Sequence, residues 1–138
     1  MEALDNLVKI NKLKREPRDA KEFAGMLRAG DTKLNDSQIF GLSEDSQFAL
    51  AYGAAHAFSL AALRWYGYRS DSRYLVFQCL QHTLAVSRAK WRVLDKCHNA
   101  RNLAEYEGHM DVDPQLLKEL ISIAKELQAL VKDLASIE

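Results

Sequence analysis

The hydrophobic positions of this chain recur every three to four residues over most of its length, which predicts helices and few strands. Glycines follow the ends of several periodic segments, and the two prolines stand where helices are expected to begin. The predicted helices cover residues 2–13, 19–28 (ended by Gly30), 32–40 (ended by Gly41), 43–66, about 71–80, 87–107 and 114–134.

The helix predicted over residues 43–66 is rich in alanine and carries Gly53 in its interior. Small residues on several faces allow close contact with more than one neighbour, so this helix is the expected spine of the fold. The last helix has a wide apolar stripe that predicts packing along its whole length. The pattern predicts an all-α protein, an up-and-down helical bundle over residues 43–138 with an N-terminal helical extension over residues 1–42, all in one domain.

Composition narrows the functional classes. The chain of 138 residues is 48% hydrophobic and 28% charged, enough to bury a core. Its 19 basic residues balance 19 acidic ones, so no global field attracts nucleic acid or an anionic membrane. A contact with RNA or DNA must therefore come from a local basic patch.

The pattern of charged and apolar residues also bears on the cellular location of the protein. No positive stretch followed by an apolar core is visible near Met1, and the most apolar segment, residues 48–65, is too short and polar for a membrane span. Cys79 and Cys97 lack the paired spacing of zinc or redox sites, so we expect two reduced, buried thiols. The expected location is the cytoplasm, with no membrane partner.

The residues that could bind a ligand or take part in catalysis lie mainly on one predicted helix. Its sequence from Trp91 to Gly108 is WRVLDKCHNARNLAEYEG. At about 100° per residue, its side chains separate into two faces. The narrow apolar face contains Val93, Cys97, Ala100 and Ala104. The opposite face contains Trp91, Leu94, Asp95, His98, Arg101, Asn102, Glu105 and Tyr106. We expect this second face to be at least half covered, in a cleft or against a second subunit.

The residues of the polar face suit the handling of phosphate. Arg101 can grip a phosphate or carboxylate in a fork, and Asn102 can orient a substrate atom or a water. His98 is the natural proton carrier, and Tyr106 can donate a hydrogen bond or stack on a base. These four are the candidate catalytic residues, and Glu105, Asp95 and Arg69 are the candidate substrate-binding residues. The alternative is a structural polar network that ties helices together.

Other polar residues have simpler interpretations. His56 is expected to be a hydrogen-bonded core histidine, His82 to lie near a helix end, and His109 to be exposed in a loop. A possible basic rim surrounds Trp65, Tyr66 and Tyr68, although a solvated charged face is the default; its arginines are Arg64, Arg69, Arg73, Arg88 and Arg92. The histidines and glutamates lack the spacing of a helical metal site, so no metal or cofactor is expected.

The motif RNLAEYEGHMDVD, from Arg101 to Asp113, resembles that of the HEPN superfamily of small helical bundles. The arginine, the asparagine and the Val112-Asp113 helix start match, and the spine SQFALAYGAAHAFSLAALRWYGYR is similar to the long early helix of the family. Tyr106 stands where the family has histidine, and Gly108 stands where many members have tyrosine. His98, one turn before Arg101, is a possible replacement for that histidine, with His109 as a less well-placed one.

The resemblance implies an HEPN-type fold and a function directed at RNA, with the motif residues of two subunits meeting in a homodimer. One hypothesis is a metal-independent ribonuclease, a toxin or defence component with a nucleotidyltransferase-type antitoxin as partner. The alternative is a non-catalytic HEPN module that docks a partner protein or a nucleotide. A tyrosine in place of the histidine favours this alternative, because tyrosine is a poor general base at neutral pH.

Overall fold

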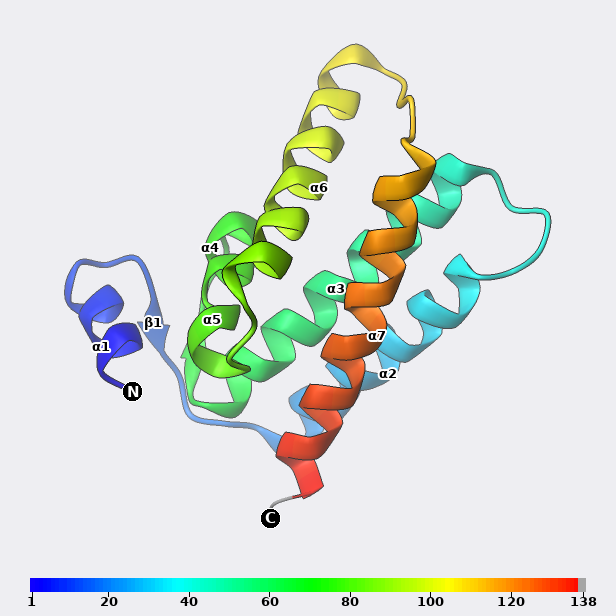
Figure 1. Cartoon of the computed structure of the whole chain (residues 1–138). Coiled ribbons are helices and arrows are strands. Elements are labelled where there is room, and N and C mark those ends of the chain that lie inside the picture. The colour runs from blue at the N-terminus through cyan, green and yellow to red at the C-terminus, as the bar shows by residue number, and fades with distance from the viewer. Residues whose placement is uncertain (137–138) are drawn as a thin grey trace.

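The computed structural model describes residues 1–136 and shows an all-helical protein with one very short sheet (Figure 1). Its elements are α1 (Glu2–Lys9), β1 (Lys14–Arg15), α2 (Ala20–Ser37), α3 (Glu44–Trp65), β2 (Tyr68–Arg69), α4 (Arg73–Gln78), α5 (Leu80–Thr83), α6 (Arg88–Glu107) and α7 (Pro114–Ser136). The prediction of an all-α bundle is confirmed at this level.

Helix α3 is the spine of the bundle, as its alanines predict. α2 and α7 pack along it, while α4, α5 and α6 contact other parts of its surface (Figure 1). Its small residues Ala51, Ala54 and Ala61 are fully buried in the main core together with Phe58. The side chain of Ser43 caps the helix by accepting a hydrogen bond from the Ser46 amide, as the sequence predicts.

Helix α2 is one continuous helix, so the prediction of two short helices separated by Gly30 is wrong. Gly30 is buried in mid-helix, where a Cβ atom would lie 2.5 Å from Cε1 of Phe58. This glycine therefore serves the close approach of α2 to α3 and does not end a helix. The chain turns later, at Gly41, whose φ of 94° suits glycine.

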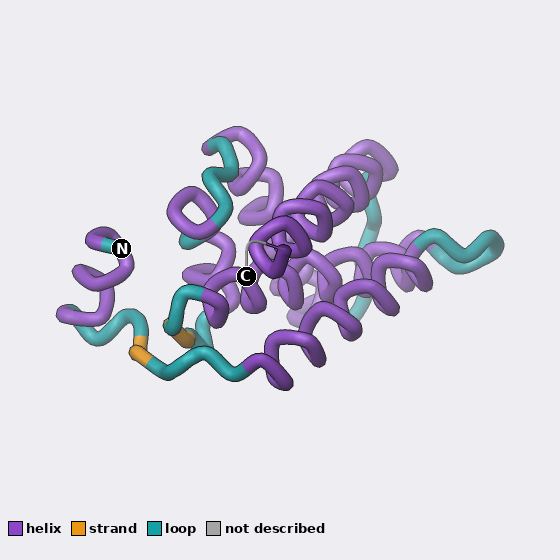
Figure 2. The backbone as a smooth tube through the Cα atoms, turned by 90° about the horizontal axis from the view of Figure 1, so that it is seen from below, coloured by secondary structure: helices purple, strands orange, loops and turns teal. Residues whose placement is uncertain are grey.

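The first residues form an arm that lies to one side of the other helices (Figure 2). α1 ends at Lys9, earlier than predicted, and the chain then turns to bury Leu13. β1 pairs antiparallel with β2, with Lys14 opposite Arg69. Leu4 and Leu13 join a second, smaller core against α3, β2 and α4, completed by Leu63, Tyr68, Leu75, Val76 and Cys79.

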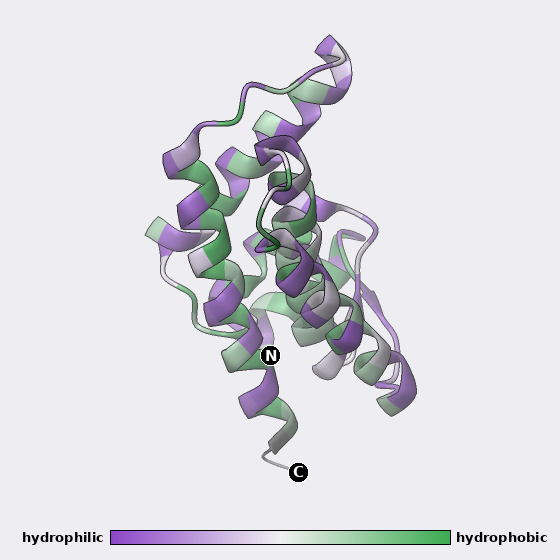
Figure 3. Cartoon of the chain, turned by 90° about the vertical axis from the view of Figure 1, so that its right-hand side faces the viewer, coloured by the Kyte–Doolittle hydropathy of each residue, from purple (hydrophilic) through white to green (hydrophobic). Residues whose placement is uncertain are grey.

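Helices α6 and α7 complete the bundle, and hydrophilic and hydrophobic residues alternate along both (Figure 3). Gly108 ends α6 in the left-handed conformation, and the carboxylate of Asp113 accepts a hydrogen bond from the Gln115 amide at the start of α7. Leu94, on the same face of α6 as His98 and Arg101, is buried in the main core, so this part of the face is covered as expected. Within residues 1–136, no helix is long and apolar enough to cross a membrane.

Both cysteines are buried and free, as predicted. Burial raises the pKa of Cys79 to about 11 and, with a contribution from Glu119, that of Cys97 to about 12. Both thiols therefore stay protonated at neutral pH and act as small hydrophobic residues.

Candidate functional site

A cavity of about 530 Å³ opens between α2, α3, α4 and α6, and the loop after α6 closes one side of it. Its volume lies within the range of roughly 300–1,000 Å³ that is typical of small-ligand sites. Apolar side chains line part of its wall, among them Phe48, Leu50 and Met110. Its charged or titratable lining residues are Lys33, Asp45, Tyr52, His56, Arg73, Arg101, Glu105 and His109.

Three cations reach the cavity from three different helices. Lys33 comes from α2, Arg73 is the first residue of α4, and Arg101 lies in the second half of α6. Ser72 fixes the start of α4, because its hydroxyl accepts a hydrogen bond from the Leu75 amide. The cavity thus collects positive charge in a chain whose formal net charge is zero. We name Lys33, Arg73 and Arg101 the cavity cluster.

The cavity cluster is only partly neutralised by acidic residues. Arg101 forms an ion pair with Glu105, one turn further along α6, at 2.9 Å. Lys33 and Arg73 form no ion pair with any residue in the described part of the chain. The aliphatic part of the Lys33 side chain packs over Gly53. A Cβ atom added at Gly53 would lie 3.1 Å from Cδ of Lys33. The glycine therefore leaves room for the lysine at the edge of the cavity.

Tyr52 lies beside the cavity cluster and is 1% exposed. The guanidinium carbons of Arg101 and Arg73 are 5.3 Å and 5.7 Å from the centre of its ring, within the range of cation–π contacts. Burial raises the pKa of Tyr52, although both arginines oppose the rise. Its hydroxyl therefore stays protonated at neutral pH.

Both ring nitrogens of His98 lie within hydrogen-bonding distance of a neighbouring side chain. Nδ1 is 2.8 Å from the Tyr52 hydroxyl, and Nε2 is 3.1 Å from the amide nitrogen of Asn102. If the amide donates to Nε2, the proton of a neutral ring is on Nδ1 and is donated to the tyrosine oxygen. His98 does not line the cavity itself, so it can act on a ligand there only through Tyr52 or after a change of partners.

His56, unlike His98, does line the cavity, as does His109 from the loop after α6. His56 follows Phe48 and Tyr52 at intervals of four residues, which places all three on one face of α3. Its ring meets Phe77 edge-on, with centroids 6.0 Å apart, and its nitrogens make no hydrogen bond within residues 1–136. Burial, followed by the charges of Arg73 and Lys33, lowers the pKa of His56 from 6.5 to about 4. The interpretation as a hydrogen-bonded core histidine is therefore wrong.

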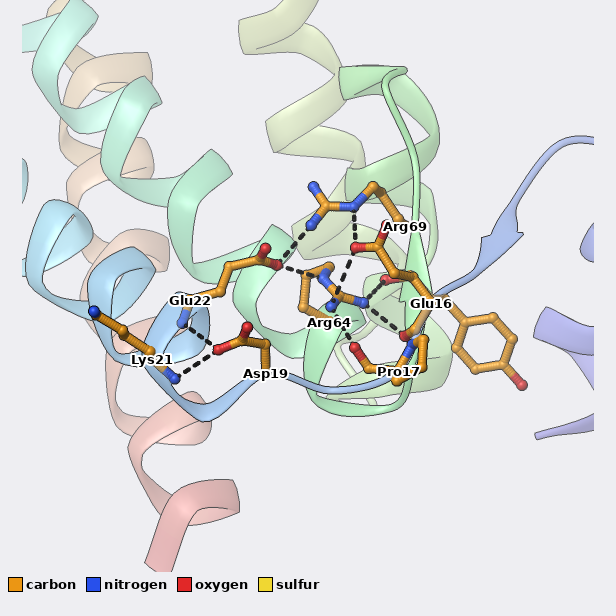
Figure 4. A network of polar contacts seen from close by, with 8 residues as sticks. Glu16, Pro17, Asp19, Lys21, Glu22, Arg64 and Arg69 are labelled. Carbon is orange, nitrogen blue, oxygen red and sulfur yellow. Dashed lines mark hydrogen bonds and ion pairs between the residues drawn. The ribbon is translucent and has the colours of Figure 1, made fainter.

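Arg69 belongs to a different group of charges (Figure 4). Its Nε donates to Glu16 at 2.6 Å and its Nη2 to Glu22 at 2.7 Å. Arg64, which is 2% exposed, also pairs with both glutamates and donates to the backbone carbonyls of Glu16, Pro17 and Tyr68. We name Arg64 and Arg69 with their two glutamates the paired cluster. It joins the N-terminal arm to α2, α3 and β2, and it does not line the cavity.

The remaining predicted site residues are scattered along α6. Asn102 and Glu105 are exposed on their outer sides but take part in the contacts above. Asp95 is half-buried and makes no hydrogen bond or ion pair within residues 1–136. Tyr106 is 94% exposed and does not line the cavity, and Leu103 beside it is 57% exposed. The structure thus brings together Arg101, Glu105, His98 and Asn102, and leaves out Asp95, Tyr106 and Arg69.

The possible basic rim around Trp65 does not form as one surface, and the solvated charged face remains the default for its exposed arginines. Arg64 and Arg69 lie in the paired cluster, whereas Arg73 lies in the cavity cluster. Trp65, at the centre of the expected rim, is covered by Arg18, whose guanidinium carbon is 3.9 Å from the indole centroid. Among the residues that the structure describes, no group of three or more histidine, cysteine or acidic side chains could hold a metal ion.

Comparison with protein-family models, with curated proteins and with solved structures finds no match to this chain.

Proposed function

We propose that this protein is an HEPN-type protein directed at RNA and that its cavity binds a phosphate of the RNA backbone. The observation that carries the proposal is the convergence of Lys33, Arg73 and Arg101 on one cavity in a chain without net charge. Two of these cations have no acidic partner among the described residues. An anionic ligand supplies the missing partner.

The chemistry of the cavity suits a phosphate better than an isolated carboxylate. Arginine forks bind two phosphate oxygens at once, and lysine adds a point charge from another direction. Cations from three helices can surround a tetrahedral anion, whereas a planar carboxylate needs only one fork. Glu105 holds the guanidinium of Arg101 at 2.9 Å and thereby limits its rotation. The site is in this way partly preorganised for its ligand.

The apolar part of the wall supports a nucleic acid as the source of the phosphate. Phe48, Leu50 and Met110 line the same cavity as the cations. Unstacked bases of single-stranded RNA pack on apolar and aromatic side chains, while the backbone follows basic groups. The HEPN-type assignment rests on the Arg101-Asn102 motif in α6 and the Val112-Asp113 start of α7, together with the alanine-rich spine α3.

The test compares two arginines on the same helix. Arg101→Ala should weaken binding of a short single-stranded RNA by about ten- to a hundredfold, as expected for a charge-assisted contact worth roughly 1.5–3 kcal/mol. Arg92→Ala, a change at an exposed position outside the cavity, is the matched control and should leave the affinity nearly unchanged. Fluorescence anisotropy measures both. Equal effects of the two substitutions would refute the proposed site.

Metal-independent cleavage of RNA is a second candidate function, favoured by the imidazoles next to the cavity cluster. His98 is linked to Tyr52 beside Arg101, and His56 faces the cavity. Imidazoles can transfer protons, and arginines can stabilise the negative charge that develops on the phosphate oxygens during cleavage. Incubation of labelled RNA with the protein in EDTA should give products that Arg101→Ala does not give. RNA that is bound but stays intact would remove this candidate and leave the binding proposal standing.

A second copy of the chain is the proposed partner of the end of α6. Leu103 and Tyr106 are large and exposed there, close in sequence to Arg101. In a homodimer of HEPN type, motif residues of both subunits face one another. Tyr106→Glu should then shift sedimentation towards the monomer, whereas Tyr66→Glu, at an exposed tyrosine at the end of α3, should not. A wild-type protein that sediments as a monomer at high concentration would contradict the dimer.

A further inference from the structure

We infer that the cavity takes up its anion together with a proton, and that His56 is the group that accepts this proton. The inference rests on the proposed function of the cavity and adds a regulation to it: anion binding depends on pH through the protonation of His56.

The position of His56 leaves its nitrogens available to a ligand. The ring lines the cavity and contacts Phe77 through its edge, and it has no hydrogen bond within residues 1–136. His98 differs, because Tyr52 and Asn102 already occupy both of its nitrogens. Of His56 and His98, only His56 can form a new hydrogen bond without breaking one. His109 also lines the cavity, from the exposed loop after α6.

The charges around His56 are mainly positive. Three permanent cations face it from separate helices, whereas two carboxylates, Asp45 and Glu105, lie in the same wall and one of them is already paired with Arg101. The titratable and charged groups around the cavity are Lys33 from α2, Asp45 and Tyr52 from α3, Arg73 from α4, His98, Arg101 and Glu105 from α6, and His109 from the following loop.

These surroundings keep His56 neutral in the empty cavity. Burial lowers its pKa first, and the charges of Arg73, Lys33, Arg101 and His98 lower it further, to about 4. At neutral pH the free protein therefore holds an uncharged imidazole among cations. Both causes, burial and nearby cations, disfavour the protonated ring.

An anion in the cavity counteracts the effect of the nearby cations on the pKa of His56. A doubly charged phosphate or sulfate offsets the cations and accepts a hydrogen bond from a protonated ring nitrogen, and both effects raise the pKa of His56. The proton comes from solvent and no covalent bond changes. By linkage, a ligand that raises the pKa binds more tightly as the pH falls, by up to about tenfold per pH unit for one coupled proton.

The experiment uses the full chain and sulfate, which keeps its double charge over the range in which histidine titrates. At constant ionic strength set with chloride, the Cε1 proton of His56 is followed by NMR against pH, with and without sulfate. We expect sulfate to raise the pKa of His56 by about one unit or more and to bind more tightly at lower pH. His82, an exposed histidine outside the cavity, provides the internal control and should not shift.

Two outcomes separate the failure of this inference from the failure of the proposed function. Sulfate that perturbs the signals of Arg101 but leaves the titration of His56 unchanged, with an affinity independent of pH, overturns the inference alone. Sulfate that perturbs neither residue overturns the anion site itself, and the proton coupling with it. In His56→Gln the amide can still donate a hydrogen bond but cannot titrate. This variant should therefore bind sulfate with an affinity that rises less steeply as the pH falls than the affinity of wild type does, whereas His82→Gln should behave as wild type.

Discussion

The protein contains two groups of basic side chains that have similar composition but opposite surroundings. In the paired cluster, Arg64 and Arg69 share Glu16 and Glu22, and backbone carbonyls accept the remaining protons of Arg64 (Figure 4). In the cavity cluster, only Arg101 has a carboxylate partner among the described residues, and Lys33 and Arg73 have none.

This difference separates a structural role from a binding role. A buried charge needs a partner, so the pairing of Arg64 is a requirement for folding and joins the N-terminal arm to the bundle. Cations that line an open cavity can keep water as their partner until an anion replaces it. The completeness of pairing, rather than the number of arginines, distinguishes the two clusters.

Removing Arg64 should have the largest effect on stability. Arg64→Met removes the Arg64 donor from three carbonyl groups and one of the two arginine donors from Glu22, which Arg69 still contacts. It should lower the free energy of unfolding by about 2–4 kcal/mol, which is below the cost of breaking a fully buried pair because the glutamates reach solvent. Arg73→Met in the cavity cluster should change it by less than about 0.5 kcal/mol. Urea denaturation measures both. Equal losses would remove the distinction between the clusters.

Gly30 tests the helix contact that positions both clusters, because α2 carries Glu22 as well as Lys33. Gly30→Ala places a methyl group 2.5 Å from the Phe58 ring and should cost about 1–3 kcal/mol. Gly25→Ala is the matched control in the same helix, since its nearest contact would be an ordinary 3.8 Å. It should stabilise by roughly 0.5–1 kcal/mol through helix propensity. A thermal melt that ranks the two variants the other way would contradict the observed packing.

The two clusters should also respond to different pH ranges. The hydrogen bond from Arg64, followed by further effects of Arg64 and Arg69, holds the pKa of Glu22 below 4.5, so its contribution to stability is present above that pH and is lost as the pH falls through the lowered pKa. His56 has a pKa lowered from 6.5 to about 4, so the unfolded chain binds more protons between these values. Its contribution is complete above pH 6.5 and is lost as the pH falls towards 4.

Unfolding midpoints in urea, measured against pH, should separate these contributions. His56→Gln should flatten the dependence in the upper range only, and Glu22→Gln in the lower range only. A wild-type protein whose stability does not change as the pH falls through the upper range would contradict the burial of a neutral His56.

Gly53→Ala should give the smallest effect, confined to the cavity cluster. The new methyl group meets the flexible stem of Lys33 at 3.1 Å, so the lysine shifts and the backbone does not. We expect stability within about 0.5 kcal/mol of wild type and RNA affinity lower by a few fold. Anisotropy and urea titrations check the two parts. A large loss of stability would show that α2 and α3 tolerate less change than the contact with Lys33 implies.

The sequence predicted those features that depend on local signals. The start of α3 at Ser43, the end of α6 at Gly108 and the start of α7 at Asp113-Pro114 follow from capping residues, which act within one turn of the chain. The ion pair between Arg101 and Glu105 has the spacing of four that brings side chains together on a helix, so it is of the same local kind. Each of these features needs only neighbouring residues.

Features that depend on distant residues were not predictable in the same way. Gly30 has the sequence appearance of a helix end, and only its contact with Phe58 shows that it lies inside α2. Lys33 and Arg73 join Arg101 because three helices meet, which no spacing in the sequence encodes. His56 did carry a signal: with Phe48 and Tyr52 it forms a row at intervals of four on the spine, and this row lines the cavity.

The most direct test of the account compares the four arginines in one spectrum. The side-chain Nε–H signals of Arg64, Arg69, Arg73 and Arg101 are recorded by ¹⁵N NMR while a short single-stranded RNA is added. We predict that the signals of Arg73 and Arg101 shift and that those of Arg64 and Arg69 stay in place, because glutamates already accept from their Nε–H groups. Shifts confined to Arg64 and Arg69, or an unchanged Arg101, would contradict the division between a paired cluster that holds the fold and a cavity cluster that binds the ligand.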